Sequence, residues 1–121
     1  MPDPARLFLR RGITTRTIGV MVMTHADDKG LICPPRVACK QVVIIPIPNS
    51  KMNDEERAAM FAKADEFAAT LSAAGVRVTM DKRENYTPGW KYNHWEVRGV
   101  PIRLELGPKD MEKQSAVLAR R

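Results

Sequence analysis

Aromatic residues are scarce in this chain of 121 residues, which contains three phenylalanines, two tryptophans and two tyrosines. Long apolar runs are absent too, and none approaches the ~20 residues that a membrane-spanning helix requires. The opening residues, MPDPARLFLRRG, lack the basic, apolar and small-residue order of a secretion signal. We therefore expect a cytoplasmic protein that has no membrane partner.

Cysteine is equally rare. Cys33 and Cys39 are separated by five residues, whereas a structural zinc site requires closely spaced pairs of ligands. His25 and Asp27 lie nearby in the sequence but do not complete such a pattern. We expect two free, half-buried thiols in a reducing compartment and no metal ion.

The overall composition fits one globular domain, or one domain with a fragment of another. Apolar residues make up 44% of the chain, which is enough for a core. Twenty Lys and Arg residues outnumber fourteen Asp and Glu residues, giving a net charge of +6. This excess is compatible with nucleic acid, an anionic membrane surface or an acidic protein as a partner, and does not choose among them.

The middle of the chain predicts a strand–helix–strand unit. Residues 41–47, QVVIIPI, are typical of a strand that is buried near the middle of a sheet. Asn53 and Glu56 have the spacing of a helix capping box, and Gly75 ends the predicted helix. Apolar residues recur within it at helical spacing: Met60, Ala64, Phe67 and Leu71. Residues 76–80 alternate as a second strand, which indicates a parallel, right-handed βαβ unit.

The remaining elements are assigned from local signals. The assignments are a loop over 81–86, a short helix over 88–97 closed by Gly99, a strand over 102–106, a turn over 107–110 and a last strand over 115–119. Upstream, the β-branched residues of Gly12 to Thr24 favour a buried strand by propensity alone. The two prolines of Gly30 to Arg36 predict an extended linker.

Four of the seven aromatic residues lie between Tyr86 and Trp95, where charges of both signs separate them. Exposed aromatic rings stack on unpaired bases, at ~1–3 kcal/mol per base. Lys and Arg bond guanine O6 and N7, and carboxylates can accept from the Watson–Crick N–H groups of guanine in single-stranded RNA loops. A segment with all three kinds of side chain is suited to read guanines.

A structural interpretation of the same segment competes with this one. The size of the Trp90 ring favours a buried position, whereas the sequence leaves Trp95 and Tyr92 open between core and surface. His94 is expected to be a hydrogen-bonded structural residue, because no nucleophile lies near it in the sequence. Arg83 and Glu84 would then belong to a solvated turn.

Two segments resemble known proteins. DKRENYTPGWKYNHWEVRGVPIRLELGPKD is similar to the anticodon-binding domain of prolyl-tRNA synthetases, especially the eukaryotic and archaeal-like type, and the resemblance runs from QVVIIPI to the C-terminus. GITTRTIGVMVMTHADDKGLICPPRVA resembles motif 3 of the class II catalytic domain and the connection that follows it. The implied organisation is a catalytic-domain remnant and linker at 1–40, followed by an anticodon-binding domain at 41–121.

The resemblance implies an α/β fold with a mixed sheet of about four to five strands flanked by helices. It also implies a helix that begins near Arg16, against the propensity of that segment. In the intact family, a proline–tRNA ligase of protein biosynthesis, Thr14 and Arg16 would contact ATP, which is used with Mg. The implied partners are tRNA-Pro and the rest of the synthetase or another synthetase chain, and the intact family is usually homodimeric. No cofactor is expected in this chain itself.

Prolyl anticodons end in two guanines, and the resemblance makes the charged and aromatic residues candidates for reading them. The candidates are Asp81, Arg83, Glu84, Lys91, Trp95, Glu96 and Arg98. We expect Arg83, Lys91 and Glu96 to line a groove between the 81–86 loop and the short helix. The assignment of each residue to a guanine stays open, and a solvated helix face is the alternative for Lys91 and Glu96.

The sequence also departs from the family. Class II motifs 1 and 2 are absent, so that no catalytic residue is expected and the chain alone should not activate proline. Residues 1–11 do not resemble the family sequence before motif 3. The family also continues beyond SAVLARR, so that we expect a C-terminally truncated domain with one sheet face exposed.

Three hypotheses about function remain: an anticodon-binding module, a chain that assists ligation with a separate catalytic chain, and an interaction or structural protein that lacks specific RNA binding.

Overall fold

The computed structural model describes residues 12–113 and 115–121. The expectations about residues 1–11, which concern a secretion signal and their unlikeness to the family, lie outside this range. Along the chain the elements are α1 (Arg16–His25), β1 (Val42–Pro46), α2 (Asp54–Ala73), β2 (Val78–Met80), α3 (Pro88–Val97), β3 (Ile102–Leu106), α4 (Pro108–Glu112) and β4 (Val117–Arg120). Over these two ranges, no helix is both long enough and apolar enough to cross a membrane.

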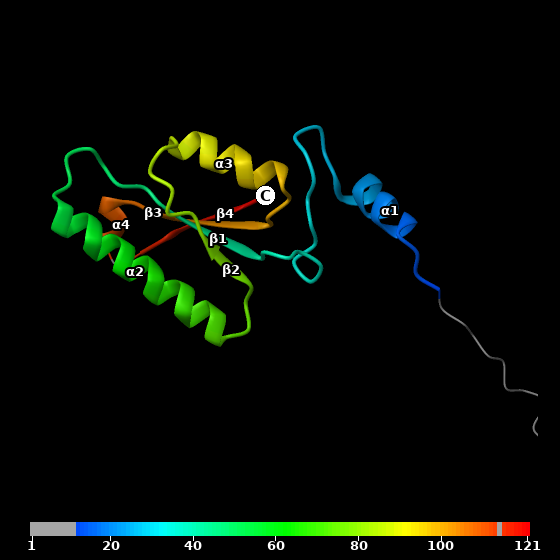
Figure 1. The fold of residues 1–121 in the computed structure, drawn as a ribbon, viewed down its shortest axis with the longest axis horizontal. Coiled ribbons are helices and arrows are strands. Elements are labelled where there is room, and N and C mark those ends of the chain that lie inside the picture. The colour runs from blue at the N-terminus through cyan, green and yellow to red at the C-terminus, as the bar shows by residue number, and fades with distance from the viewer. Residues whose placement is uncertain (1–11, 114) are drawn as a thin grey trace, which may run out of the picture.

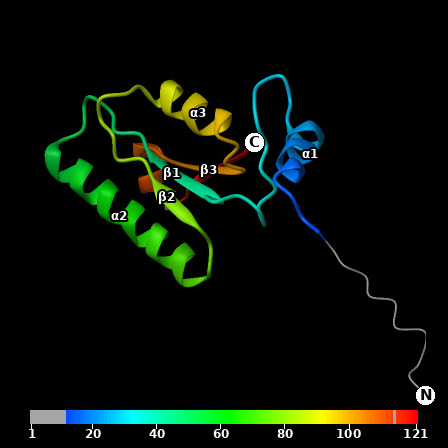
Figure 2. The same cartoon turned by 45° about the vertical axis from the view of Figure 1, so that its right-hand side comes forward.

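The four strands form one mixed sheet in the order β2-β1-β3-β4 (Figure 1). β1 pairs in parallel with both β2 and β3, and β4 runs antiparallel to β3. α2 covers one face of the sheet and α3 covers the other (Figure 2). The predicted α/β fold with a mixed sheet and a βαβ unit is therefore confirmed.

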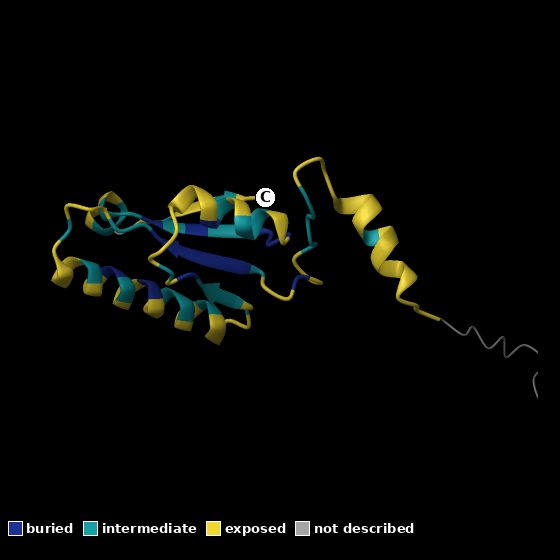
Figure 3. Cartoon of the chain, turned by 45° about the horizontal axis from the view of Figure 1, so that its top comes forward, coloured by how far each residue is buried: buried dark blue, intermediate teal, exposed yellow. Residues whose placement is uncertain are grey.

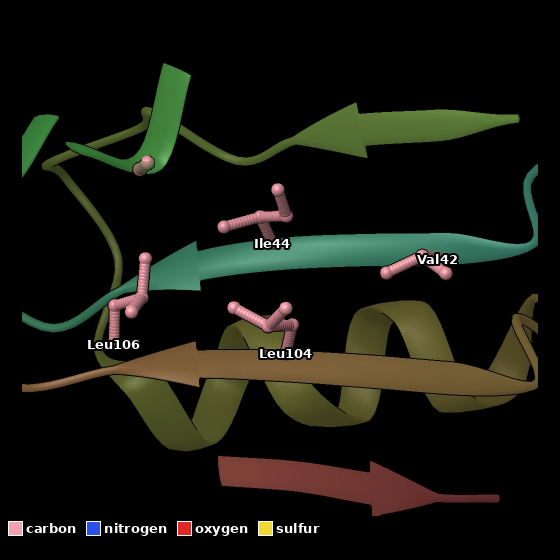
Figure 4. Close-up of a cluster of buried hydrophobic side chains, with 5 residues drawn as sticks. Val42, Ile44, Leu104 and Leu106 are labelled. Carbon is pink, nitrogen blue, oxygen red and sulfur yellow. The ribbon is translucent and has the colours of Figure 1, made fainter. Parts of the chain in front are cut away.

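The two faces of the sheet divide the core into two clusters. Val42 and Ile44 point to one face with Leu104 and Leu106, where Ala64 of α2 packs on them (Figure 4). Val43, Ile45 and Val100 form the second cluster on the face covered by α3. Because every residue of β1 is buried, this strand is continuously apolar rather than alternating, as expected for a strand covered on both faces.

The strongest local signals of the sequence correspond to the observed ends of α2. The backbone N–H of Asn53 donates to the Glu56 carboxylate at 3.1 Å, which satisfies a group that the helix leaves unpaired. Met60 and Ala64 are fully buried along the sheet-facing side. Gly75 follows the helix with a φ of 81°, a left-handed conformation that glycine adopts without steric cost.

Several predicted elements need correction. Residues 16–25 form the helix α1, as the family resemblance implies, and not the strand that propensity alone favours (Figure 3). None of its residues is buried, and a segment with no neighbouring strand pairs its backbone groups internally in a helix. The turn expected at 107–110 contains the short helix α4, where the backbone N–H of Gly107 donates to Asp110 at 3.0 Å. The predicted strand over 76–80 is shorter, because only Val78–Met80 pairs with β1.

The linker after α1 is attached to the C-terminal part of the domain. Arg121 donates two hydrogen bonds to the Asp27 carboxylate, at 2.9 and 2.7 Å, and this pairing lowers the pKa of Asp27 to about 2. The backbone N–H of Cys33 donates to the carbonyl of Gly99 at 3.0 Å. Cys33 is half-buried, but Cys39 is exposed, which corrects the expectation of two half-buried thiols.

Gly99 and Gly89 offer a matched test of this attachment. Gly99 has a φ of 75°, and a Cβ there would lie 3.0 Å from the Leu31 carbonyl oxygen and 3.1 Å from the Cys33 nitrogen. Gly99→Ala should therefore lower the free energy of unfolding by about 1–3 kcal/mol. Gly89 lies in α3 with open space around it, so Gly89→Ala should be neutral or stabilising by up to about 1 kcal/mol. Equal denaturant midpoints for the two variants would contradict the attachment.

Candidate nucleic-acid interface

A cavity of about 280 Å³ lies at the carboxyl ends of β1 and β2, between the first turns of α2 and α3. Parallel sheets of this kind bind ligands beyond the carboxyl ends of their strands. The lining residues are Pro46, Pro48, Ser50, Arg57, Phe61, Arg83, Glu84, Tyr86, Pro88 and Lys91. Three of these ten side chains are cationic and one is anionic, so that the cavity has an excess of positive charge.

Two of the cations have incompletely satisfied hydrogen-bond donors. Lys91 is 5% exposed, and its Nζ donates to the Asp81 backbone carbonyl at 3.4 Å, which is a long and weak hydrogen bond. The Nε of Arg57 is buried and has no hydrogen-bond partner within the described structure. Since buried charged groups are normally paired, both side chains are suited to an acceptor that enters the cavity. The alternative prediction, in which Lys91 belongs to a solvated helix face, is therefore wrong.

Asp81 holds the loop that forms one wall of the cavity. Its side chain is 1% exposed; Oδ1 accepts from Arg83 Nε at 2.8 Å and Oδ2 accepts from the Trp95 indole Nε1 at 2.8 Å. The Arg83 guanidinium, followed by the Trp95 indole, holds the pKa of Asp81 well below its usual range, against the opposite effect of burial. Asp81 and Trp95 therefore position Arg83 rather than facing solvent themselves.

A column of stacked rings runs from the 81–86 loop onto the outer surface of α3. Tyr86 and Trp90 have ring centroids 3.9 Å apart and an interplanar angle of 13°, and Trp90 stacks on His94 at 4.7 Å and 24°. Arg83 lies over the Tyr86 and Trp90 rings at 5.3 and 5.1 Å. Trp90 is 39% exposed, so the prediction of a buried Trp90 is wrong. Burial, with Arg98 and Arg83 nearby, lowers the pKa of His94.

Glu96 lies apart from the cavity. Its Oε1 accepts from Arg103 Nη1 at 2.6 Å, and the Arg103 guanidinium lies 4.1 Å from the Tyr92 ring centroid. Arg98 lies over Trp95 at 5.8 Å. Tyr92 and Trp95 are half-buried and pack on the sheet, which resolves the two positions that the sequence left open.

Of the seven candidates for reading guanines, the structure brings Arg83, Glu84 and Lys91 to one cavity. The expected groove does not include Glu96, which follows Lys91 by five residues and so lies on another side of the helix. Arg57, Tyr86 and Trp90 were not among the candidates. The four-residue spacing of Trp90 and His94 was a signal for part of the column, because both lie in α3 and residues four apart share a helix face, whereas Tyr86 precedes the helix.

Thr14 and Arg16, the residues that the resemblance assigns to ATP, are exposed at the start of α1. Neither belongs to the cavity at the strand ends. Arg16 is the first residue of α1 and Thr14 precedes its N-cap, and two such exposed side chains do not enclose a nucleotide. Within the described residues, Thr14 and Arg16 therefore do not form a nucleotide site by themselves.

Comparison with known protein families matches residues 41–121 to the family described as the anticodon binding domain. These residues include the whole sheet, both helices that cover it and every residue of the cavity. The chain therefore belongs to the anticodon-binding domain family.

The relatives that match include proline–tRNA ligases from eukaryotes and bacteria. The bifunctional glutamate/proline–tRNA ligase of Cricetulus griseus is 54% identical over 91% of this chain and 7% of its own length. The cytoplasmic proline–tRNA ligase of Arabidopsis thaliana is 49% identical over 89% of this chain and 20% of its own length. The proline–tRNA ligase of Mycobacterium leprae (strain Br4923) is 54% identical over 91% of this chain and 22% of its own length. The resemblance to the anticodon-binding domain of prolyl-tRNA synthetases is confirmed, and the chain spans less than a quarter of each relative.

The pKa of Tyr92 tests the packing of α3 on the sheet. Burial, and secondarily the nearby Glu105 carboxylate, raises the pKa of Tyr92 from its usual value near 10 to about 12. Tyr86→Phe leaves Tyr92 as the single tyrosine, and its absorbance should titrate near pH 12. The stability that protonated Tyr92 contributes should be present below pH 10 and lost as the pH rises towards 12. Titration near pH 10 in protein that circular dichroism shows to be folded would contradict this packing.

Proposed function

We propose that this chain is the part of a proline–tRNA ligase that binds the anticodon of tRNA-Pro. The observation that carries the proposal is the buried ammonium of Lys91, which lies in a cavity with Arg83 and Glu84 and pairs with no carboxylate among the residues that the structure describes. Membership of the anticodon-binding domain family supports the same conclusion.

The donors and acceptor of the cavity complement guanine. Lys91 and Arg83 supply N–H groups of the kind that bond guanine O6 and N7. The Glu84 carboxylate is an acceptor suited to the N1–H and amino groups, which are free in an unpaired loop. Arg57 adds a buried donor from the opposite wall. The cavity of about 280 Å³ is open to solvent through exposed residues such as Glu84 and Tyr86.

The other candidates take supporting roles in this proposal. Asp81 and Trp95 hold Arg83 and α3 in place through their shared hydrogen bond. Glu96 is engaged with Arg103, and contact of Glu96 or Arg98 with a guanine stays a prediction. Substitution of Asp81 would therefore change the affinity for RNA indirectly, by displacing Arg83.

The wider activity is part of the same proposal. In a complete enzyme, proline would be joined to tRNA-Pro with ATP and Mg, and Thr14 and Arg16 would meet the nucleotide within a pocket whose other walls come from the rest of the synthetase. The named cytoplasmic relative supports a cytoplasmic location. A second copy of the synthetase, as in a homodimer, is the partner that the resemblance implies.

A fold that is retained for protein interaction, without specific RNA binding, is the second candidate. The observation in its favour is the exposed apolar surface of α1, where Ile18 is 59% and Met23 is 87% exposed. A remnant that kept only its fold would still bind polyanions through its charge of +6. Preference for guanine therefore separates the two functions, and affinity for RNA alone does not.

The first test uses the anticodon stem-loop of tRNA-Pro and the same RNA with both anticodon guanines replaced by adenines. The protein should prefer the guanine RNA, because adenine offers an amino group where Lys91 and Arg83 require an acceptor. Fluorescence anisotropy measures the affinity for each RNA. Repeating the titrations at a second salt concentration measures the sequence-independent electrostatic contribution to that affinity. Equal affinities for the two RNAs would leave only a generic basic surface.

Lys91→Met and Lys40→Met are matched variants for the same assay. Lys91→Met keeps the apolar stem and removes the ammonium, so it should cost ~1–3 kcal/mol for the guanine RNA and little for the adenine RNA. Lys40 is exposed and precedes the N-terminal end of β1, whereas the cavity lies at the carboxyl end of that strand, so Lys40→Met should weaken both RNAs slightly and alike. A preserved guanine preference in folded Lys91→Met would contradict the assignment of this cavity.

Proline activation provides a separate prediction. The chain of 121 residues should show no proline-dependent exchange between ATP and pyrophosphate, because positioning of the reactants supplies much of the catalysis and Thr14 and Arg16 alone cannot position them. Measurable exchange by the pure protein, together with its loss in Arg16→Ala, would show that the chain retains an active site.

A further inference from the structure

Cys33 and Cys39 are both free thiols, and neither is among the residues of the two core clusters or of the cavity at the strand ends. The chain between them forms a turn, because the carbonyl of Pro34 accepts from the backbone N–H groups of Val37 and Ala38, each at 2.9 Å. A turn of this kind brings the chain on its two sides together. The two thiols therefore flank one closed turn.

The side chain of Arg77 holds this turn in place. Its guanidinium donates to three backbone carbonyls of the turn, those of Pro35, Arg36 and Ala38, at 3.1, 3.1 and 3.0 Å. The Gln41 side chain donates to the Pro35 carbonyl at 2.9 Å and accepts from the Arg77 backbone N–H at 2.9 Å. Because these hydrogen bonds fix the turn, they also fix the position of one end of the turn relative to the other.

The two cysteines also lie at the same end of the sheet. The backbone N–H of Cys33 donates to the Gly99 carbonyl at 3.0 Å. Cys39 and Gly99 each come three residues before the first pair of β1 with β3, which joins Val42 to Ile102. The thiols also act on each other, since burial, followed by the neighbouring Cys39 thiol, raises the pKa of Cys33. The turn and the sheet therefore place the thiols in one neighbourhood.

We propose that Cys33 and Cys39 are a reversible redox pair, which forms a disulfide across the 34–38 turn when it meets a small disulfide such as oxidised glutathione. Disulfides in a reducing compartment are usually transient and respond to redox conditions. The inference goes beyond RNA binding, because neither thiol borders the cavity at the strand ends. In the oxidised form, the linker that carries Cys33 is attached covalently to the residues that lead into β1.

The exposed Cys39 is the thiol that reacts first. Arg36 and Lys40, which are exposed basic residues, lie on either side of it in the sequence, and their charge attracts the anionic glutathione disulfide. The Cys39 thiolate attacks one sulfur of that disulfide, forms a mixed disulfide and displaces one glutathione thiolate. The Cys33 thiolate then attacks the Cys39 sulfur and displaces the second glutathione thiolate. The displaced thiolates take up the two protons that the cysteines lose, so that the protein is oxidised by two electrons and glutathione disulfide is reduced by two.

Equilibration of the full chain in mixtures of reduced and oxidised glutathione tests this pair. After quenching with acid, the intact mass should be that of a monomer without two hydrogen atoms, and a thiol reagent should detect no free thiol in it. The oxidised fraction gives the effective concentration of one thiol at the other. This concentration should be about 10- to 100-fold higher in folded protein than in protein unfolded by guanidinium, because a disulfide that fits the native structure and the native structure itself stabilise each other.

Arg77→Gln and Arg36→Gln separate the position of the thiols from the charge around them. Each variant removes one guanidinium, but Arg77 holds the turn with its side chain, whereas Arg36 contributes its backbone carbonyl to those hydrogen bonds. Arg77→Gln should therefore lower the effective concentration towards the unfolded value. Arg36→Gln should leave the equilibrium unchanged and slow the first step.

Single cysteine variants test the order of the two steps. Cys33→Ser should stop at a mixed disulfide between Cys39 and glutathione, because the second thiol is missing. Cys39→Ser leaves the half-buried Cys33, which should react with glutathione disulfide more slowly than Cys39 does in Cys33→Ser. Equal rates for the two variants would overturn the assignment of Cys39 as the first thiol.

Three results would overturn the redox pair itself. They are a folded wild type that stops at a mixed disulfide with glutathione, a disulfide that links two chains, and an effective concentration in folded protein that does not exceed the unfolded value. The comparison of folded with unfolded wild type requires no substitution, so it decides the question even if circular dichroism shows that Arg77→Gln does not fold. None of these measurements includes RNA, so failure of the redox pair and failure of the proposed function are separate outcomes.

Discussion

The buried carboxylate of Asp81 is the group on which the geometry of the interface depends. It accepts hydrogen bonds from Arg83 in its own loop and from Trp95 on α3, so it joins the end of β2 to the helix on the next connection. A buried carboxylate without partners would carry a large desolvation cost. With these partners, the loop and the helix keep one relative position, and Arg83 is held between the cavity and the column of rings.

The helical period of α3 distributes its side chains among three environments. Trp90 and His94 face outward, Lys91 faces the cavity, and Tyr92 with Trp95 packs on the sheet. The start of the helix is set by Thr87, whose hydroxyl accepts from the Trp90 backbone N–H, and by Pro88 in the first turn. Binding and packing residues can therefore alternate along ten residues because neighbouring positions differ in direction by about 100°.

Local patterns predicted the elements that carry strong short-range signals. The apolar run of β1, the Asn53 and Glu56 cap of α2 and the Pro88 start of α3 all correspond to observed ends or centres. The segment over 16–25 was the main error from propensity alone, since β-branched residues favour a strand only where another strand is available to pair. Its resemblance to a known family predicted the helix, because a family pattern includes tertiary context that a propensity scale omits.

By itself, the sequence determined the class of the fold, the concentration of aromatic and charged residues in one segment and the family to which the domain belongs. The tertiary structure alone decided how those residues are divided. It placed Arg83, Glu84 and Lys91 around one cavity and paired Glu96 with Arg103 away from it. It also exposed Trp90 while half-burying Trp95. The reason is that a side chain's burial and partners depend on which helix face meets the sheet. Contacts between distant segments, such as the packing of Tyr92 and Trp95 on Val43 and Ile45, determine that face.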